Sequence, residues 1–237
     1  MNTTHLLEST LKGLFPILAN ITDYKVKHLP SLRKTIDPFS PKETYEEVLD
    51  FIQYQEIPIH TLESYLNGFI SDNINISYRL KSGQSFLSKW SKNLGKHKQL
   101  REVCNDVIGI RFIVDLSRNE MESVLLKIIK SVGYTIDIIN FYEKPKAVDD
   151  GYRGMHLYFR DNPKCFPVEI QFWTFHDAIL HFYSHEVIYK NKPSQEAIEY
   201  SLAIRKTIDS LPEAPNELEL SFIHFLYKIV YANYGGE

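Results

Sequence analysis

A near-continuous apolar run, VIGIRFIV at residues 107–114, is the feature that most constrains the fold of this chain. Strands covered on both faces read as unbroken apolar runs, whereas half-exposed strands alternate. Arg111 interrupts the run, and burying its charge is costly unless it is paired. A capped helical pattern follows at 117–133, and a further strand pattern at 134–142. The order strand, helix, strand predicts a right-handed crossover within a mixed sheet.

Helical spacing of apolar residues dominates both ends of the chain. It predicts helices at 4–20, from the capping box at 40–43, at 60–71, 175–190, 194–210 and 216–233. Strands are expected at 73–81, 151–159 and 166–173. The predicted fold class is therefore α/β (α+β), a mixed β-sheet flanked by helices. We expect a helical N-terminal extension at 1–72 packed on a core at 73–192, and C-terminal helices at 193–237, together one compact domain.

A basic stretch ends the strand at 73–81. From Arg79 to Arg101 there are seven Lys or Arg and no acidic residue, although acidic residues outnumber basic ones overall. Alternation places Arg79 and Lys81 opposite the apolar side chains of the strand. Gly83 predicts a tight turn, after which Ser85 and Lys89 lie one helical turn apart. Such a strand, turn and helix predict a polyphosphate site. The alternative is a solvated basic helix face, above all for the Lys92–Lys98 half.

Two carboxylates are candidates for chemistry beside this site. Alternation in VEIQFW at 168–173 points Glu169, Gln171 and Trp173 away from the core. Asp106 stands at the entry of the preceding buried strand. Two acidic oxygens next to a polyphosphate suit Mg²⁺, which prefers oxygen ligands. The alternative is an ordinary ion-pair network with Arg111 and Arg153.

Tyr152 follows a glycine at a loop-to-strand junction, where its ring can stack on a base. Arg153 and His156 are close enough in sequence to reach phosphates. A core tyrosine and a structural histidine are the alternative reading for these positions.

These motifs together resemble the synthetase domain of the RelA/SpoT family over about residues 76–190. The matching residues, in order and spacing, are Arg79-x-Lys81-x3-Ser85-x3-Lys89, Asp106-x2-Gly109-x-Arg111, Gly151-Tyr152-Arg153-x2-His156, Glu169-Ile-Gln171 with Thr174, and His185-x3-Tyr189-Lys190. The resemblance implies a fold related to nucleotidyltransferases. It also implies a pyrophosphokinase that transfers pyrophosphate from ATP to a ribose 3′-hydroxyl and releases AMP.

Roles for single residues follow from the same resemblance. ATP would be held by Arg79, Lys81, Ser85, Lys89 and Arg111. Asp106 would bind Mg²⁺, and Glu169 would help with the metal or take the proton from the attacking hydroxyl. Tyr152 would stack on the acceptor base, with Arg153, His156 and Gln171 near phosphates.

Departures from the family concern the acceptor side. Trp173 and Ser184 stand where makers of guanosine alarmones usually have Arg and Glu. Trp173 offers a stacking surface in place of a cation. With Gly154, these features resemble the toxic branch of small alarmone synthetases, which includes enzymes that modify the 3′ end of tRNA and stop translation. A hydrolase signature is incomplete: His176-Asp177 is interpreted as helix surface, and His181 with His185 as a helix face rather than a zinc site.

Three functions remain open from the sequence. The first is a toxin that pyrophosphorylates the 3′ CCA end of tRNA and is restrained by an antitoxin protein. Its candidate tRNA contacts are basic residues outside the pocket, namely Lys25, Lys27, Arg33, Lys34, Lys92, Lys96 and Lys98. The second is an alarmone synthetase acting on GDP, GTP or an adenosine nucleotide. The third is an inactive nucleotide- or RNA-binding module.

The cellular location is expected to be the cytoplasm. The sequence has neither a membrane-spanning apolar stretch nor a leader pattern. Cys104 and Cys165 have no metal or redox spacing and are expected to be buried thiols.

Overall fold

The computed structural model describes residues 2–22, 32–33, 35–36, 42–56, 58–147, 149–162, 164–184 and 194–210, with four single positions between 217 and 225. Several predictions fall outside these residues. They are the start of the capping box at 40–43, most of the helix expected at 216–233, the tRNA-contact candidates Lys25, Lys27 and Lys34, and the motif His185, Tyr189 and Lys190.

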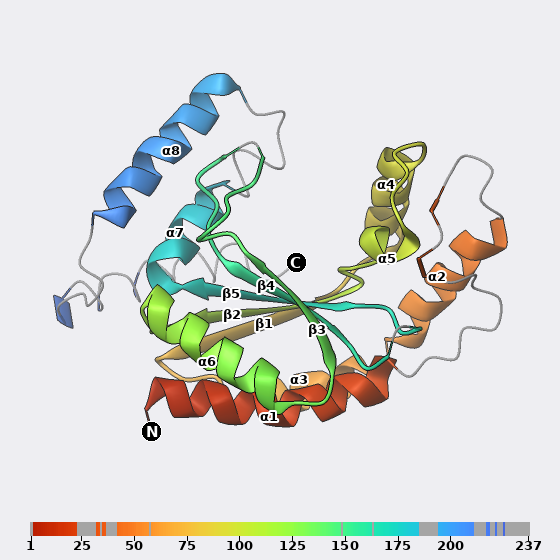
Figure 1. Cartoon of the computed structure of the whole chain (residues 1–237), viewed down its shortest axis with the longest axis horizontal. Helices are drawn as coiled ribbons and strands as arrows, with labels where there is room; N and C mark the ends of the chain where they lie inside the picture. Colours follow the sequence, from red (N-terminus) through yellow and green to blue (C-terminus); the bar gives the residue numbers. More distant parts are fainter. Residues whose placement is uncertain are drawn as a thin grey trace.

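A five-stranded mixed sheet forms the centre of the fold (Figure 1). Its strands are β1 (Ile74–Leu80), β2 (Ile108–Val114), β3 (Thr135–Asn140), β4 (Met155–Arg160) and β5 (Val168–Thr174). The spatial order is β1-β2-β5-β4-β3, with β2 and β5 parallel and the other pairs antiparallel. The predicted fold class is confirmed. The run at 107–114 is an interior strand, as its unbroken apolar pattern predicted.

Helix α6 (Arg118–Ser131) connects β2 to β3, which lies at the far edge of the sheet. Ser117 and Glu120 form the capping box expected at its start. Since β3 is antiparallel to β4, and β4 to β5, β3 runs parallel to β2. The connection is therefore a crossover of two parallel strands, spanning β5 and β4.

One face of the sheet builds the main hydrophobic core. Helices α1 (Thr3–Thr22), α3 (Ile59–Asn67) and α6 cover this face (Figure 1). The apolar positions of α1 recur every three or four residues, so Leu7, Leu11 and Leu18 are fully buried on one stripe. Phe112 and Phe172 stack at 5.1 Å between ring centroids and tie β2 to β5. Covering this face leaves the polar side chains of the strands on the other one.

The second face carries the polar residues in register. Arg79 pairs with Gly109, and Gly109 with Glu169, so these positions form one row across β1, β2 and β5. A second row runs through Arg111 and Gln171 to His156. Residues paired across adjacent strands point to the same face. The sheet therefore gathers side chains from positions 79 to 171 on one surface.

Two groups of helices stand at opposite ends of this polar face (Figure 1). At one end, α2 (Lys42–Tyr54), α4 (Gly83–Asn93) and the short α5 (Leu100–Val103) share a second apolar cluster around Phe51, Phe86 and Trp90. At the other end lie α7 (Phe175–Ser184) and α8 (Gln195–Asp209).

The turn predicted at Gly83 is wrong. Gly83 is the first residue of α4, and Ser82 caps the helix by accepting a hydrogen bond from the Ser85 amide at 3.2 Å. Serine is a strong N-cap because its hydroxyl satisfies an otherwise unpaired amide, so the chain enters the helix without a special glycine conformation.

Both cysteines are buried thiols, as predicted. Among the helices that the structure describes, none has the length and apolar character needed to cross a membrane.

Candidate active site

Asp106 is held between two lysines. Lys81 Nζ donates to Asp106 Oδ2 at 2.7 Å, and Lys89 Nζ donates to Oδ1 at 2.8 Å. Lys89 also donates to Asn105 Oδ1 at 2.7 Å. Burial acts to raise the pKa of Asp106, but the two ammonium groups outweigh it and lower that pKa below its usual value. Asp106 is therefore an ionised carboxylate that holds both lysines at one place.

Arg79 reaches across the same face. Its Nη2 lies 3.8 Å from Asp106 Oδ2, and its side chain is 56% exposed. A Cβ at position 109 would stand 3.3 Å from Arg79 Nε, so Gly109 leaves the space in which the arginine lies flat on the sheet. Ser85 is exposed in the first turn of α4. Three cations thus surround one carboxylate.

Glu169 is buried and hydrogen-bonded at both oxygens. Oε1 accepts from the Tyr158 hydroxyl at 3.0 Å and contacts His156 Nδ1 at 3.2 Å, while Oε2 accepts from Gln171 Nε2 at 3.0 Å. Burial acts to raise the pKa of Glu169, but the hydrogen bonds from His156 and Tyr158 help to lower it below its usual value. The negative charge of Asp106 also acts to raise the pKa of Glu169. The two carboxylates, Lys81 and Lys89 therefore lie on one side of the sheet.

A magnesium ion would find only part of its ligand set in these side chains. Within the described ranges, no three His, Cys, Asp or Glu side chains converge on one point. Asp106 and Glu169 together offer two carboxylates, and Mg²⁺ typically completes its shell with phosphate oxygens and water. The residues present therefore fit a magnesium ion that arrives with a triphosphate.

Tyr152 lies deep at the other end of the face and is 7% exposed. Its ring stacks on His181 at 4.4 Å, with 15° between the planes, and Lys146 Nζ lies 4.1 Å from the ring centroid. Because a stacked ring and an ammonium cannot share one face, the two partners cover opposite faces of Tyr152. An acceptor base that stacks here must take the place of Lys146.

The other acceptor-side candidates are already engaged. Arg153 forms a double hydrogen bond with Asp149, at 2.9 and 3.1 Å, instead of standing free. Arg111 donates to Gln171 Oε1 at 3.2 Å, and its guanidinium lies 4.0 Å over the indole of Trp173. The sequence left open whether Arg111 and Arg153 neutralise the two candidate carboxylates, Asp106 and Glu169. Arg153 pairs with Asp149, and the lysines of the basic stretch neutralise Asp106.

Trp173 does not provide the stacking surface expected for an acceptor. Its side chain is 4% exposed, covered by Arg111 and in edge contact with His181 at 4.2 Å. That expectation is wrong because β5 turns the indole under α7 rather than toward solvent.

Two of the segments that carry candidate tRNA contacts lie side by side. Arg33, Lys92, Lys96 and Lys98 are all exposed. The Ile36 amide donates to the Lys98 carbonyl at 2.9 Å, and the Arg101 amide donates to the Leu32 carbonyl at 2.9 Å. Two basic segments about sixty residues apart in sequence are thereby joined side by side.

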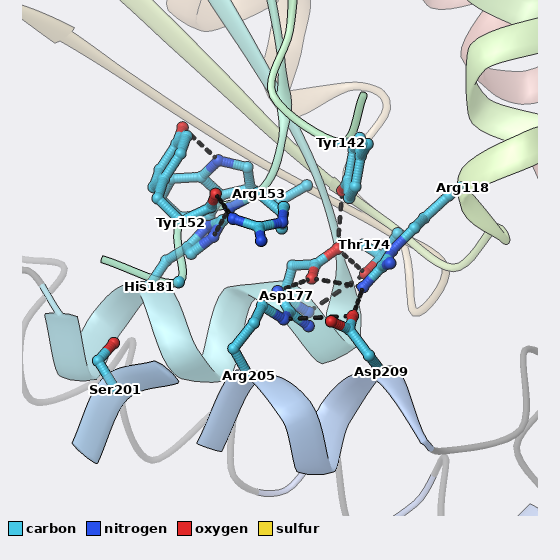
Figure 2. Close-up of polar contacts among 12 residues, drawn as sticks. Arg118, Tyr142, Tyr152, Arg153, Thr174, Asp177, His181, Ser201, Arg205 and Asp209 are labelled. Carbon is cyan, nitrogen blue, oxygen red and sulfur yellow. Dashed lines mark hydrogen bonds and ion pairs between the residues drawn. The ribbon is translucent and has the colours of Figure 1, made fainter. Parts of the chain in front are cut away.

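A buried ion-pair network joins α7 to α8, and the sequence reading missed it (Figure 2). Asp177, interpreted above as helix surface, is fully buried. Its carboxylate accepts hydrogen bonds from Arg205, from the Tyr142 hydroxyl and from Thr174 Oγ1, and Arg118 lies within 3.3 Å. The signal available in the sequence was the pair Thr174 and Asp177, the form of a helix cap.

Helix α8 also contacts the loop that carries Tyr152. Ser201 Oγ donates to the Asp150 carbonyl at 2.6 Å. Gly151 has a φ of +83°, and a Cβ there would stand 3.1 Å from the Ser201 carbonyl. His181, on the buried face of α7, accepts the Arg153 amide at 3.2 Å through Nε2. Helices α7 and α8 thus fix the loop from both sides.

Comparison with known proteins places the described site within one family. Residues 78–194 match the family model for the region found in RelA/SpoT proteins. No curated protein matches the chain significantly. Solved structures similar to it include small alarmone synthetase 1 from Bacillus subtilis bound to its product pppGpp, at 20% identity and a TM-score of 0.48, covering 78% of this chain and 94% of that one.

Two further solved structures cover similar shares. A GTP pyrophosphokinase family protein from Streptococcus pneumoniae is 18% identical, with a TM-score of 0.49, covering 79% of this chain and 95% of that one. The type VI effector Tas1, solved with its immunity protein, is 14% identical, with a TM-score of 0.38 and coverages of 79% and 96%.

Proposed function

Since residues 78–194 belong to the RelA/SpoT family, we propose that the chain is an ATP-dependent pyrophosphokinase acting on a ribose 3′-hydroxyl. The observation that carries this proposal is the pairing of Lys81 and Lys89 with Asp106, beside the buried base candidate Glu169. Such a site concentrates positive charge for phosphates next to an acceptor for one proton. Phosphoryl transfer needs little more, because it depends on positioning and charge neutralisation.

The reaction forms one bond and breaks one. The 3′-oxygen of the acceptor bonds to the β-phosphorus of ATP, and the bond from that phosphorus to the oxygen bridging α and β breaks, so AMP leaves. Glu169 takes the hydroxyl proton. Arg79, Lys81, Ser85 and Lys89 bind the phosphates. Asp106 would hold Mg²⁺, which would supply neutralisation of phosphate charge when bound, and this leaves Glu169 to take the proton.

The acceptor that we propose is the 3′ CCA end of tRNA, which would make the protein an inhibitor of translation. The exposed basic residues Arg33, Lys92, Lys96 and Lys98, on segments joined by backbone hydrogen bonds, support this acceptor, because a small nucleotide has no use for cations outside the pocket. An inhibitor of translation must be restrained in the cell that makes it, so we also propose an antitoxin protein.

A small nucleotide is the second candidate acceptor. The ring of Tyr152 with Arg153 and His156 nearby suits a free nucleotide as well as an RNA end. In that case GDP, GTP or an adenosine nucleotide would receive the pyrophosphate, and the product would be an alarmone.

One assay separates these acceptors. The protein is incubated with ATP labelled at the γ-phosphate, together with tRNA, GDP, GTP or an adenosine nucleotide, and release of AMP is followed in parallel. Label in tRNA, lost when the terminal adenosine carries a 3′-deoxyribose, supports the proposal. Label only in a free nucleotide selects the second candidate. If no acceptor leads to release of AMP, only the inactive binding module remains as a candidate function.

The basic surface is tested with the triple variant K92A/K96A/K98A. We expect weaker modification of tRNA and a flatter dependence of tRNA binding on salt concentration. Each lysine removed from the interface lowers the number of counterions that binding releases from the RNA. ATP affinity should stay unchanged. An unaltered salt dependence would show that these three lysines do not contact tRNA.

A further inference from the structure

Trp173 heads a chain of hydrogen bonds that ends at Glu169. Trp173 Nε1 lies 3.0 Å from the Tyr152 hydroxyl, which in turn contacts His156 Nε2. His156 Nδ1 lies 3.2 Å from Glu169 Oε1. The four side chains come from β5, β4 and the loop before β4. All four are at most 8% exposed, so water has little access to these bonds.

The direction of every bond in this chain is fixed by chemistry. An indole N–H can only donate, so the Tyr152 oxygen must accept from Trp173. The Tyr152 oxygen could accept a second bond, but its own buried proton needs an acceptor, and among the described residues His156 Nε2 is the contact that remains. That nitrogen must then be unprotonated. His156 therefore carries its proton on Nδ1 and donates it to Glu169. Burial raises the pKa of Tyr152, which keeps its hydroxyl protonated as this order requires.

The two oxygens of Glu169 are left unequal. Oε1 receives both His156 Nδ1 and the Tyr158 hydroxyl, whereas among the described residues Oε2 receives only Gln171 Nε2, at 3.0 Å. A carboxylate oxygen has two lone pairs. Oε1 is saturated by the protein, and Oε2 keeps capacity for one more donor.

We propose that Trp173 is a positioning residue which, through Tyr152 and His156, holds Glu169 with Oε2 as the oxygen that receives the 3′-hydroxyl proton. This role rests on the proposed function. It adds the atom that takes the proton, Glu169 Oε2, and the residue that holds Glu169 in place, Trp173. Trp173 itself touches no substrate. Gly154 is what admits the indole to this position, because a Cβ there would stand 3.1 Å from Trp173 Nε1.

A spectroscopic measurement tests the chain without any need for turnover. Histidine labelled with ¹⁵N in both ring nitrogens gives correlations that identify the protonated nitrogen, and loss of one set in H156Q assigns His156. In the resting wild-type protein we expect the proton on Nδ1. A proton on Nε2 would reverse the direction of the chain and overturn the proposal.

Kinetics test whether the chain serves catalysis. Replacing Trp173 by 3-benzothienylalanine exchanges the indole N–H for sulfur at nearly the same shape. Since one buried hydrogen bond is lost, we expect kcat to fall about tenfold, with the KM for ATP unchanged. Y152F removes the next donor and should reduce kcat to a similar extent. Combining the two changes should cost little more than either alone, because they break one chain.

The outcomes separate this proposal from the proposed function. Full activity of the benzothienyl protein, or additive losses in the combined variant, would overturn the role of Trp173 while leaving pyrophosphate transfer intact. If the wild-type protein transfers pyrophosphate to no acceptor, the proposed function fails, and the tautomer of His156 alone then decides the hydrogen-bond chain.

Discussion

Gly154 and Trp173 are packed so closely that a Cβ at position 154 would stand 2.8 Å from Trp173 Cδ1 and 3.2 Å from the Phe172 carbonyl. Since the backbone carbonyl cannot yield, a side chain at 154 must push the indole away. The glycine of the β4 entry and the tryptophan of β5 thus form one structural unit on the acceptor side of the site.

The variant G154A should therefore be destabilised and slow. We expect a loss of about 1–3 kcal/mol in the free energy of unfolding from overpacking, measured by urea denaturation, and a lower kcat. The matched control is G133A, because a Cβ at Gly133 meets nothing within 4 Å. Equal stability of the two variants would show that the indole moves without cost.

The variant D106N should bind ATP and fail to transfer pyrophosphate. Loss of the carboxylate frees Lys81 and Lys89 for phosphate oxygens and removes a candidate magnesium ligand. Titration calorimetry with EDTA should give ATP affinity equal to or above that of wild type, and activity should fall at least about a hundredfold, in line with the loss of a positioned charge. D72N, at an exposed turn, is the control. Loss of ATP binding in EDTA would mean that Asp106 mainly orders the two lysines.

The variant R205L should unfold more easily because it leaves the fully buried Asp177 without its closest cation. Breaking a buried pair on one side typically costs about 3–5 kcal/mol. The exposed neighbour on α8 supplies the control K206A. Thermal or urea unfolding measures both. The double variant D177A/R205M should lose less than the sum of its single changes, since no charge is left alone; an additive loss would argue against direct coupling.

Stability should fall as the pH drops below about 4. Burial acts to raise the pKa of Asp177, but Arg205, His181 and Arg118 lower it below the ordinary value of 3.8. A carboxyl with a depressed pKa in the folded state contributes stability that is complete above its unfolded value and is lost as the pH falls through the folded one. Urea unfolding between pH 3 and 7 should show this loss, and D177N should flatten it. An unchanged slope in D177N would assign the acid sensitivity to other groups, such as Asp106.

The variant K146A should improve access to Tyr152. Lys146 lies over the ring face opposite His181, so its removal opens that face to an acceptor base. We expect a lower KM for the acceptor and an unchanged KM for ATP. Lys144, exposed in the same loop, gives the control K144A. A higher KM for the acceptor in K146A would instead make Lys146 a ligand of the acceptor.

Much of the sheet was predictable because strand periodicity is a local property. The alternation at 168–173 correctly separated Glu169 and Gln171 from the core residues between them. The capping box at Ser117 and Glu120 was predicted for the same reason. The prediction at Gly83 was wrong because Ser82 caps the helix by accepting from the Ser85 amide. In the sequence, this cap is a weaker signal than the turn that a glycine suggests.

The covering of side chains by distant segments could not be predicted. Trp173 and Asp177 were both assigned to exposed positions, although each is at most 4% exposed. Arg111 of β2 and His181 of α7 cover Trp173. Asp177, on α7, is covered by groups from α6, α8 and Tyr142. Periodicity does not say which distant segment will cover a given side chain.

By itself the sequence determined which side chains share a face of each strand, because successive residues point to opposite sides whatever the rest of the chain does. Only the tertiary structure decided that Lys81 and Lys89 meet at Asp106 and that Asp177 meets cations from α6 and α8. Pairing of charges across long separations depends on how helices dock, and docking is set by the combined packing of the whole core rather than by any local pattern.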